Sequence, residues 1–179
     1  MARKTAAFEM PWQYNFPPFF TLQPNLDTRK LQLDAWCALV LNYHRANRLH
    51  VLDINEAQTG ALFHNSAINR KLSLEVISLI LDELRRTGNV EWLDKQKRRC
   101  WILWRSVDDW AKVIYRWAVD SGMLNTVCTL YELIHGHDTA DEEFYGMDQE
   151  LMLQALKILE RQKKAELITI DGNSGVKFF

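Results

Sequence analysis

Catalysis or metal binding would depend on histidine, cysteine and carboxylate side chains. In this sequence these side chains form no catalytic pattern. His135, His137 and Asp138 lie close together, but two histidines at i and i+2 in a turn lack further ligands nearby. The sequence contains no Walker loop, no G-x-S-x-G, no H-E-x-x-H and no dinucleotide-binding fingerprint. We therefore predict that the protein is not an enzyme and holds neither a cofactor nor a metal.

The three cysteines, Cys37, Cys100 and Cys128, are odd in number and far apart, and no C-x-x-C occurs. This pattern indicates reduced, mostly buried thiols. The longest uninterrupted apolar stretch, residues 35–41, is far shorter than the roughly 18 residues that suggest a membrane span. No hydrophobic signal core follows the basic residues near the N-terminus. We expect a soluble cytoplasmic protein that reaches membranes only through its partners.

A segment rich in proline and aromatic residues, Pro11–Pro24, contains all four prolines of the protein. A regular helix is excluded there, because proline lacks an N–H donor and pushes its predecessor into extended conformations. We predict an extended strap, which either packs on its own domain or docks on another protein. Docking fits the composition better, since prolines reduce the entropy lost on binding while Trp and Phe are common interface anchors.

Charge is distributed unevenly along a chain whose net charge is only −1. Residues 1–104 contain 14 Lys/Arg and 10 Asp/Glu, a balance of +4, whereas residues 105–179 contain 8 and 13, a balance of −5. The densest acidic cluster is Asp141, Glu142 and Glu143. These carboxylates either complement a helix N-terminus, where negative charge is favoured, or form the rim of a site for a basic helix.

Helical periodicity, capping residues and turn signals divide the sequence into two halves with the same order of elements. The first half contains predicted helices at 25–47, 55–63 and 73–87, a strand near 51, and a hairpin of strands 90–93 and 100–104. The second contains a helix from 106, a strand-like segment at 127–133, an acidic helix capped by Thr139 with Glu142, a helix at 148–164, and a hairpin of strands 167–170 and 176–179.

A shift of 77 positions superposes the two halves, pairing Val90 with Leu167 and Asp94 with Asp171. Helix, strand, helix, helix and hairpin is the order of a winged-helix domain. The predicted fold class is therefore α+β, with two tandem winged-helix domains that each have a helical core and a β-hairpin wing. The predicted divisions are a disordered N-terminus at 1–10, the strap at 11–24, and domains at 25–104 and 105–179.

Many winged-helix domains bind DNA, so a DNA-binding or transcription-related protein is the alternative function. A DNA-reading helix is expected to be rich in Lys and Arg, but the predicted helix 73–87 carries Glu75, Asp82 and Glu83. The one basic cluster is the hairpin tip, Lys95–Arg99, whose simplest interpretation is a solvated turn. A protein that acts by binding other proteins is the favoured prediction.

Three blocks of the sequence resemble one family, and the resemblance covers nearly the whole chain from residue 11 onwards. The blocks are Pro11–Tyr14 with Phe16–Asn25, then Gly88–Lys95, and finally Gly175–Phe179. They are similar to the vacuolar protein-sorting-associated protein 25 family, the small subunits of the ESCRT-II endosomal sorting complex. The resemblance implies two tandem winged helices and a Y-shaped complex, in which two copies of the chain dock on two larger winged-helix subunits.

The same resemblance implies a non-enzymatic adaptor in multivesicular-body sorting of ubiquitinated cargo, cytoplasmic and recruited peripherally to the endosomal membrane. Ubiquitin recognition would belong to other subunits. The implied docking residues, which we expect to be anchors outside the core, are Trp12, Phe16, Pro17, Pro18, Phe19 and Phe20. The second domain is implied to bind a helix of the ESCRT-III subunit that initiates filament assembly, with Asp141, Glu142 and Glu143 as candidates for the rim of that site.

Overall fold

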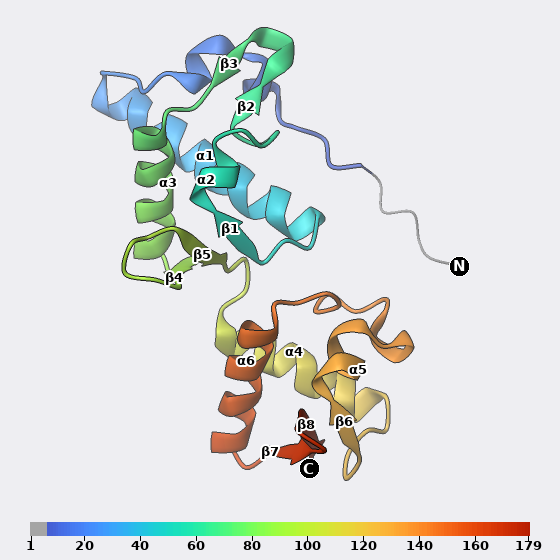
Figure 1. The fold of residues 1–179 in the computed structure, drawn as a ribbon. Coiled ribbons are helices and arrows are strands. Elements are labelled where there is room, and N and C mark those ends of the chain that lie inside the picture. The colour runs from blue at the N-terminus through green and yellow to red at the C-terminus, as the bar shows by residue number, and fades with distance from the viewer. Residues whose placement is uncertain (1–6) are drawn as a thin grey trace. The chain divides into compact units, whose positions relative to one another are not determined.

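The computed structural model describes residues 7–179, and these form two compact units that divide between Trp104 and Arg105 (Figure 1). Of the predicted disordered N-terminus, residues 1–6 lie outside the described residues. Residues 7–10 have no regular secondary structure, yet Phe8 and Met10 pack against the core of the first unit. The ring of Phe8 meets that of Tyr43 edge-on, with centroids 5.7 Å apart.

The first unit consists of three α-helices, a three-stranded sheet and a small two-stranded ribbon. Its regular elements are α1 (Leu26–Ala46), β1 (Val51–Asp53), α2 (Ile54–Ala57), β2 (His64–Asn65), β3 (Arg70–Lys71), α3 (Leu74–Arg86), β4 (Val90–Trp92) and β5 (Arg99–Ile102). The sheet is antiparallel in the order β1-β5-β4, with Trp101 of β5 opposite Val51 on one side and Glu91 on the other. The strands β4 and β5 are the predicted wing.

Side-chain caps explain where the two long helices of this unit begin. The Oδ1 atom of Asn25 accepts a hydrogen bond from the Thr28 N–H at 3.0 Å, and the Oγ atom of Ser73 accepts one from the Val76 N–H at 3.3 Å. Each cap satisfies an N–H that has no partner within its helix. Behind them, α1 and α3 enclose a core whose fully buried members include Trp36, Phe63, Leu72, Ile77, Ile80 and Leu81.

The second unit repeats the same order of elements. They are α4 (Val107–Asp120), β6 (Val127–Thr129), α5 (Leu130–His135), α6 (Gln149–Arg161), β7 (Ala165–Ile170) and β8 (Asn173–Phe178). Its antiparallel sheet has the order β6-β8-β7, and α4, α5 and α6 cover it around a core centred on Trp110, Phe144 and Phe178. Helix, strand, helix, helix and hairpin thus occurs in both units, which confirms the predicted α+β class with two tandem winged-helix domains.

The second unit differs from the prediction between residues 127 and 140. The predicted strand 127–133 ends at Thr129, which caps α5: its hydroxyl accepts from the Glu132 N–H at 3.1 Å, and the Glu132 carboxylate accepts from the Thr129 N–H at 2.9 Å. The predicted helix at Thr139 is absent from the described residues; Thr139 instead lies buried in the 3-10 turn His137–Thr139. The capping box exists, but at the earlier threonine.

In the first unit, the predicted helix 55–63 is likewise only the single turn Ile54–Ala57. No helix of the described part of the chain is both long and apolar enough to span a lipid bilayer.

Candidate partner-binding surfaces

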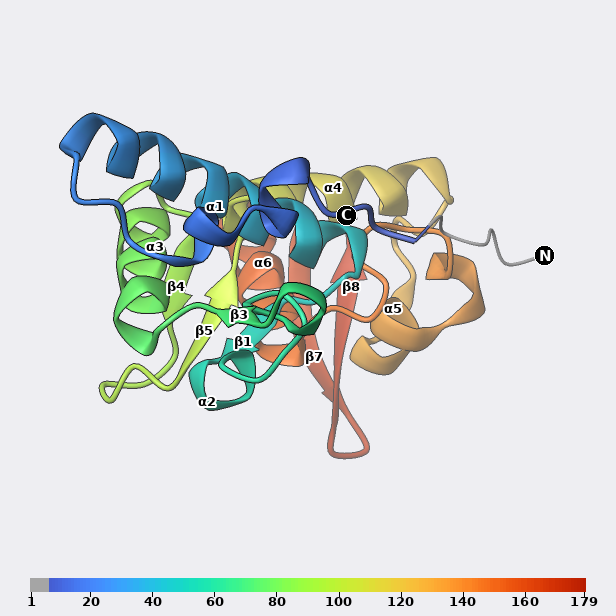
Figure 2. The ribbon, with the colours of Figure 1, turned by 90° about the horizontal axis from the view of Figure 1, so that it is seen from above.

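The proline-rich strap of the first unit folds into two short 3-10 turns, Trp12–Asn15 and Pro17–Phe20, that lie along α1 (Figure 2). The N–H of Tyr14 donates to the Pro11 carbonyl at 3.0 Å, and that of Phe19 donates to the Phe16 carbonyl at 2.9 Å. The prediction of an extended strap is therefore wrong at these residues. The reason is that the fixed φ of proline, near −65°, also suits the start of a 3-10 turn.

Two side chains of α1 hold the second turn in place. The Gln32 amide is buried; its Nε2 donates to the Phe19 carbonyl at 3.0 Å and to the Thr21 carbonyl at 2.8 Å, and its Oε1 accepts from the Gln23 N–H at 3.1 Å. The Trp36 Nε1 also donates to the Phe19 carbonyl, at 2.9 Å. The backbone of the strap is thus fixed by side chains and not by a strand partner.

The first turn is held by the segment around β2. The Asn65 Nδ2, itself buried, donates to the Tyr14 carbonyl at 2.7 Å, and the Tyr14 hydroxyl donates to the Ala61 carbonyl. Both ends of the strap are therefore anchored on the first unit, which leaves little conformational entropy to lose when a partner binds.

The two consecutive phenylalanines of the strap lie in the core of the first unit. Phe19 is 5% exposed and Phe20 is 4% exposed, and both rings contact the indole of Trp36. The expectation that the strap aromatics lie outside the core is therefore wrong for this pair. The Trp36 ring provides the apolar surface against which both phenylalanine rings are buried, so neither ring needs a partner protein to cover it.

The remaining docking candidates lie at the surface beside α1. Trp12 is 70% exposed and Phe16 is 48% exposed, their ring centroids are 5.7 Å apart, and Pro17 and Pro18 are also exposed. Together with Leu31 of α1, which is 72% exposed, they form what we call the Trp12 surface: Trp12, Phe16, Pro18, Leu31 and Ala35, around an open depression of about 430 Å³. Phe19 lies at its floor, whereas Phe20 does not line it.

The sequence analysis did not identify Leu31 as a surface residue of a binding site, although its position in the sequence indicates this. The predicted apolar face of α1 contains Leu33, Trp36 and Val40, and Leu31 lies off that face by its helical spacing. A large apolar residue on the polar side of a helix, next to a segment that exposes Trp and Phe, indicates an interaction surface.

In the second unit, one of the three acidic candidates is engaged within its own domain. The guanidinium of Arg105 pairs with the Glu143 carboxylate, with Nε–Oε2 and Nη2–Oε2 distances of 3.0 and 2.9 Å. The hydrogen bond to Glu143 raises the pKa of Arg105.

The other two acidic candidates differ in their exposure: Asp141 is exposed and Glu142 is half-buried. Glu142 and Glu143 line an open groove of about 440 Å³ along α4, which Arg105, Lys112 and Arg116 also line. The groove therefore carries both signs of charge.

The three thiols are wholly or partly shielded from solvent. Burial raises the pKa of Cys100 to about 12 and the pKa values of Cys37 and Cys128 to about 11. Cys100 and Cys128 are buried, and Cys37 is half-buried against α3, with its Sγ 3.8 Å from the Ile80 carbonyl oxygen. Thiols held protonated in this way are poor nucleophiles and poor metal ligands.

Comparison with known proteins places this architecture in a family. Residues 13–148 match the family described as ESCRT-II complex subunit. The chain belongs to the ESCRT-II subunit family. It is 56% identical to vacuolar protein-sorting-associated protein 25 of Danio rerio over 97% of this chain and 99% of the relative. The identity to the Homo sapiens protein of that name is 53%, over 97% and 98%.

Solved structures agree with these sequence relatives. The crystal structure of subunit VPS25 of the endosomal trafficking complex ESCRT-II superposes with a TM-score of 0.82 at 31% identity, covering 94% of this chain and 98% of that one. The crystal structure of the endosomal complex ESCRT-II (VPS22/VPS25/VPS36) superposes with a TM-score of 0.79 at 30% identity, covering 94% and 98%. This member of the ESCRT-II family thus shares the fold of its relatives over nearly its whole length.

Proposed function

We propose that this chain is a non-enzymatic adaptor subunit that docks on the two larger ESCRT-II subunits through the Trp12 surface and the first unit. The observation that carries the proposal is the exposure of Trp12, at 70%, on a strap whose backbone is fixed at both ends. A related VPS25 chain is found in a complex with VPS22 and VPS36, and we infer that the counterparts of those two proteins are the docking partners here.

The energetics of the Trp12 surface support docking. Truncating a well-buried aromatic anchor at an interface typically costs about 2–4 kcal/mol, so Trp12 and Phe16 could together supply much of a specific affinity. The support beneath them is rigid, because Gln32 and Trp36 bind the neighbouring carbonyls. Preorganisation of this kind reduces the entropy cost of association. Two copies of the chain in each complex follow from the family resemblance.

We infer that the second unit recruits the initiating ESCRT-III subunit by receiving a basic helix. Between Arg116 and Lys157 the sequence has eight carboxylates and no Lys or Arg, which concentrates the negative charge of this unit in one segment. Exposed Asp141 lies within it. Through these two contacts the chain would link ESCRT-II to filament assembly in the multivesicular-body sorting of ubiquitinated cargo. It would be cytoplasmic and would contact the endosomal membrane only through its partners.

Co-purification of the chain with its two larger subunits from the same organism tests the docking proposal. The double variant Trp12→Ala with Phe16→Ala should lose both subunits while its circular dichroism spectrum stays unchanged, because both side chains are exposed. Leu49→Ala, at a residue that is 45% exposed after the end of α1, is the matched control and should co-purify normally. Undiminished co-purification of the double variant would show that docking uses another surface.

A further inference from the structure

A small pocket of the first unit is lined by the last turns of α1, by β1, by α2 and by residues 60–63. It holds about 170 Å³, and we call it the His44 pocket. Sites for small molecules usually hold about 300–1,000 Å³, so this pocket has room for one side chain and not for a larger ligand. The apolar part of its lining includes Leu52, Leu62 and Phe63.

The ring of His44 presents a hydrogen-bond acceptor to this pocket. The side chain is 4% exposed, and its Nδ1 donates to the Val40 carbonyl oxygen at 2.7 Å. Burial lowers the pKa of His44, which favours the neutral ring, and the lone pair is then on Nε2. No residue that the structure describes forms a hydrogen bond with this Nε2, and the atom is not sealed from solvent. A ligand in the pocket can therefore donate to it.

Two carboxylates add negative charge to the same lining. Asp53 caps α2: its Oδ1 accepts the N–H groups of Asn55 and Glu56 at 2.9 and 3.3 Å. Glu56 is exposed, and within residues 7–179 neither carboxylate forms an ion pair. The lining described here contains no lysine or arginine. The carboxylates and the His44 ring thus bring three acceptors from three elements to one small pocket.

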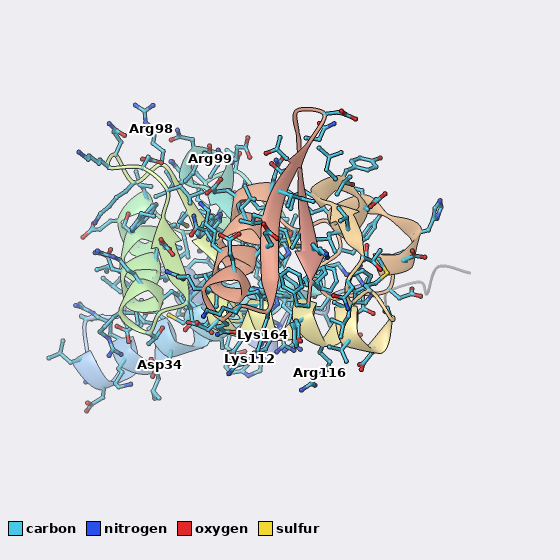
Figure 3. The ribbon with its side chains drawn as sticks, turned by 90° about the horizontal axis from the view of Figure 1, so that it is seen from below. Asp34, Arg98, Arg99, Lys112, Arg116 and Lys164 are labelled. Atoms are coloured by element: carbon cyan, nitrogen blue, oxygen red, sulfur yellow. The ribbon has the colours of Figure 1, made fainter. Side chains whose placement is uncertain are left out.

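One cation lies opposite Asp53 in the sheet. Arg99 pairs with it across β1 and β5, but no ion pair joins the two side chains. Arg98 and Arg99 lie at the hairpin end of the first unit (Figure 3). Arg45, which follows His44 in α1, is exposed and does not line the pocket. A single arginine cannot balance two carboxylates, so the pocket keeps an excess of negative charge.

We propose that the His44 pocket binds one lysine side chain of a partner protein. The alkyl stem lies on the apolar wall, and the ammonium donates to His44 Nε2 and to the carboxylates of Asp53 and Glu56. An ammonium carries three donors at one point, which matches these acceptors better than the planar fork of an arginine does. The proposal goes beyond the docking function, because the pocket shares no lining residue with the Trp12 surface.

Proton–nitrogen correlation NMR spectra of the full chain, titrated with N-acetyl-lysinamide at neutral pH, test the proposal. Backbone signals of His44 and Ala57 should shift saturably, with a dissociation constant on the order of 1 mM, as expected for a ligand of this size. N-acetyl-norleucinamide retains an alkyl stem without the ammonium, and N-acetyl-argininamide carries a guanidinium instead. Both should bind several-fold more weakly than the lysine probe.

Three variants connect the binding to the pocket. Glu56→Gln should weaken binding of the lysine probe about threefold or more, because one charge-assisted contact becomes neutral. Glu75→Gln, at an exposed glutamate in the first turn of α3 that does not line the pocket, is the matched control and should leave the affinity unchanged. His44→Phe keeps a ring and removes the acceptor, so it should weaken binding several-fold. If that variant does not fold, the comparison of the two glutamate variants decides.

Wild-type affinity in Glu56→Gln would overturn the proposal, as would the absence of saturable shifts around the pocket. An equal loss in Glu75→Gln would do the same, because the effect would then come from net charge alone. Equal binding of the norleucine probe would mean that the pocket recognises only an alkyl chain. Tighter binding of the arginine probe would overturn the choice of lysine.

Discussion

Phe19 stacks flat on Trp36, with ring centroids 4.3 Å apart and ring planes within 5° of parallel, while the Trp36 indole N–H donates to the Phe19 carbonyl at 2.9 Å. The same tryptophan therefore holds both the side chain and the backbone of one strap residue. Phe20 meets the Trp36 ring edge-on at 5.4 Å, so the indole is enclosed by two strap aromatics. This contact makes the strap part of the first unit and separates its buried residues from its exposed ones.

Because Phe19 is buried and Phe16 is exposed, replacing each by alanine should change the free energy of unfolding by very different amounts. Phe19→Ala should lower the free energy of unfolding of the first unit by about 3–5 kcal/mol, the usual cost of deleting a buried Phe ring. Phe16→Ala, at a residue that is 48% exposed, should change it by less than about 0.5 kcal/mol. Urea titration followed by tryptophan fluorescence measures both. Equal stability of the two variants would mean that the strap is not packed on Trp36 in solution.

A second prediction concerns Gln32, which is 7% exposed and binds the strap backbone with both ends of its amide. Gln32→Leu keeps the volume approximately but leaves the Gln23 N–H and part of the bonding of the Thr21 carbonyl unsatisfied. The expected loss is about 1–3 kcal/mol. Amide hydrogen exchange should accelerate at residues 19–23 before it does so in α3.

The control for this variant is Gln162→Leu, at an exposed glutamine of the second unit, which should leave exchange in the strap unchanged. Normal protection of residues 19–23 in Gln32→Leu would show that the turn is stable without the amide.

The sequence sufficed for the architecture because its signals are local. Asn25, Ser73, Ser106 and Asp148 were each expected to begin a helix, and each side chain accepts a hydrogen bond at the N-terminus of one. The wings followed from alternating apolar runs around turns. These features depend on neighbours within a few residues, which a sequence displays directly.

Features that depend on distant residues were missed. Thr129 with Glu132 and Thr139 with Glu142 have the same capping-box spacing, but the capping box forms at Thr129, at the start of a helix that buries Leu130, Leu133 and Ile134. The prolines of the strap likewise permit an extended chain or a 3-10 turn, and the choice is made by Trp36, which lies 17 residues from Phe19.

A third prediction separates the acidic residues of the second unit into one that stabilises the fold, Glu143, and two that affect association with a partner, Asp141 and Glu142. Glu143→Gln should lower the free energy of unfolding of that unit by about 1 kcal/mol, because the partly exposed pair with Arg105 loses its charge. Asp141→Lys with Glu142→Lys should not destabilise the fold comparably. It should slow association with a basic ESCRT-III helix several-fold, with a smaller change in dissociation and a weaker effect at high salt.

Thermal melts and stopped-flow mixing at two salt concentrations separate these roles. An unchanged association rate in the double variant would place the helix-binding site elsewhere on the second unit, whatever the melts of Glu143→Gln show.

A fourth prediction concerns His44, which lies in the last turn of α1, is 4% exposed, and has its Nδ1 2.7 Å from the Val40 carbonyl oxygen. Burial lowers its pKa below the ordinary 6.5, and the hydrogen bond to the Val40 carbonyl only partly opposes this. The folded chain therefore binds fewer protons at His44 than the unfolded chain does at mildly acidic pH. Stability from neutral His44 is then fully present above about pH 6.5 and is lost as the pH falls below it.

Urea titrations at about pH 7.5 and about pH 5.5 measure this dependence. The free energy of unfolding of the first unit should be lower at the acidic pH, and His44→Gln should reduce the difference, because an uncharged amide does not titrate. His135→Gln, at an exposed histidine of the second unit, is the matched control and should retain the wild-type dependence. If wild type and His44→Gln lose the same free energy between the two pH values, carboxylates or other histidines govern the acid response and His44 does not.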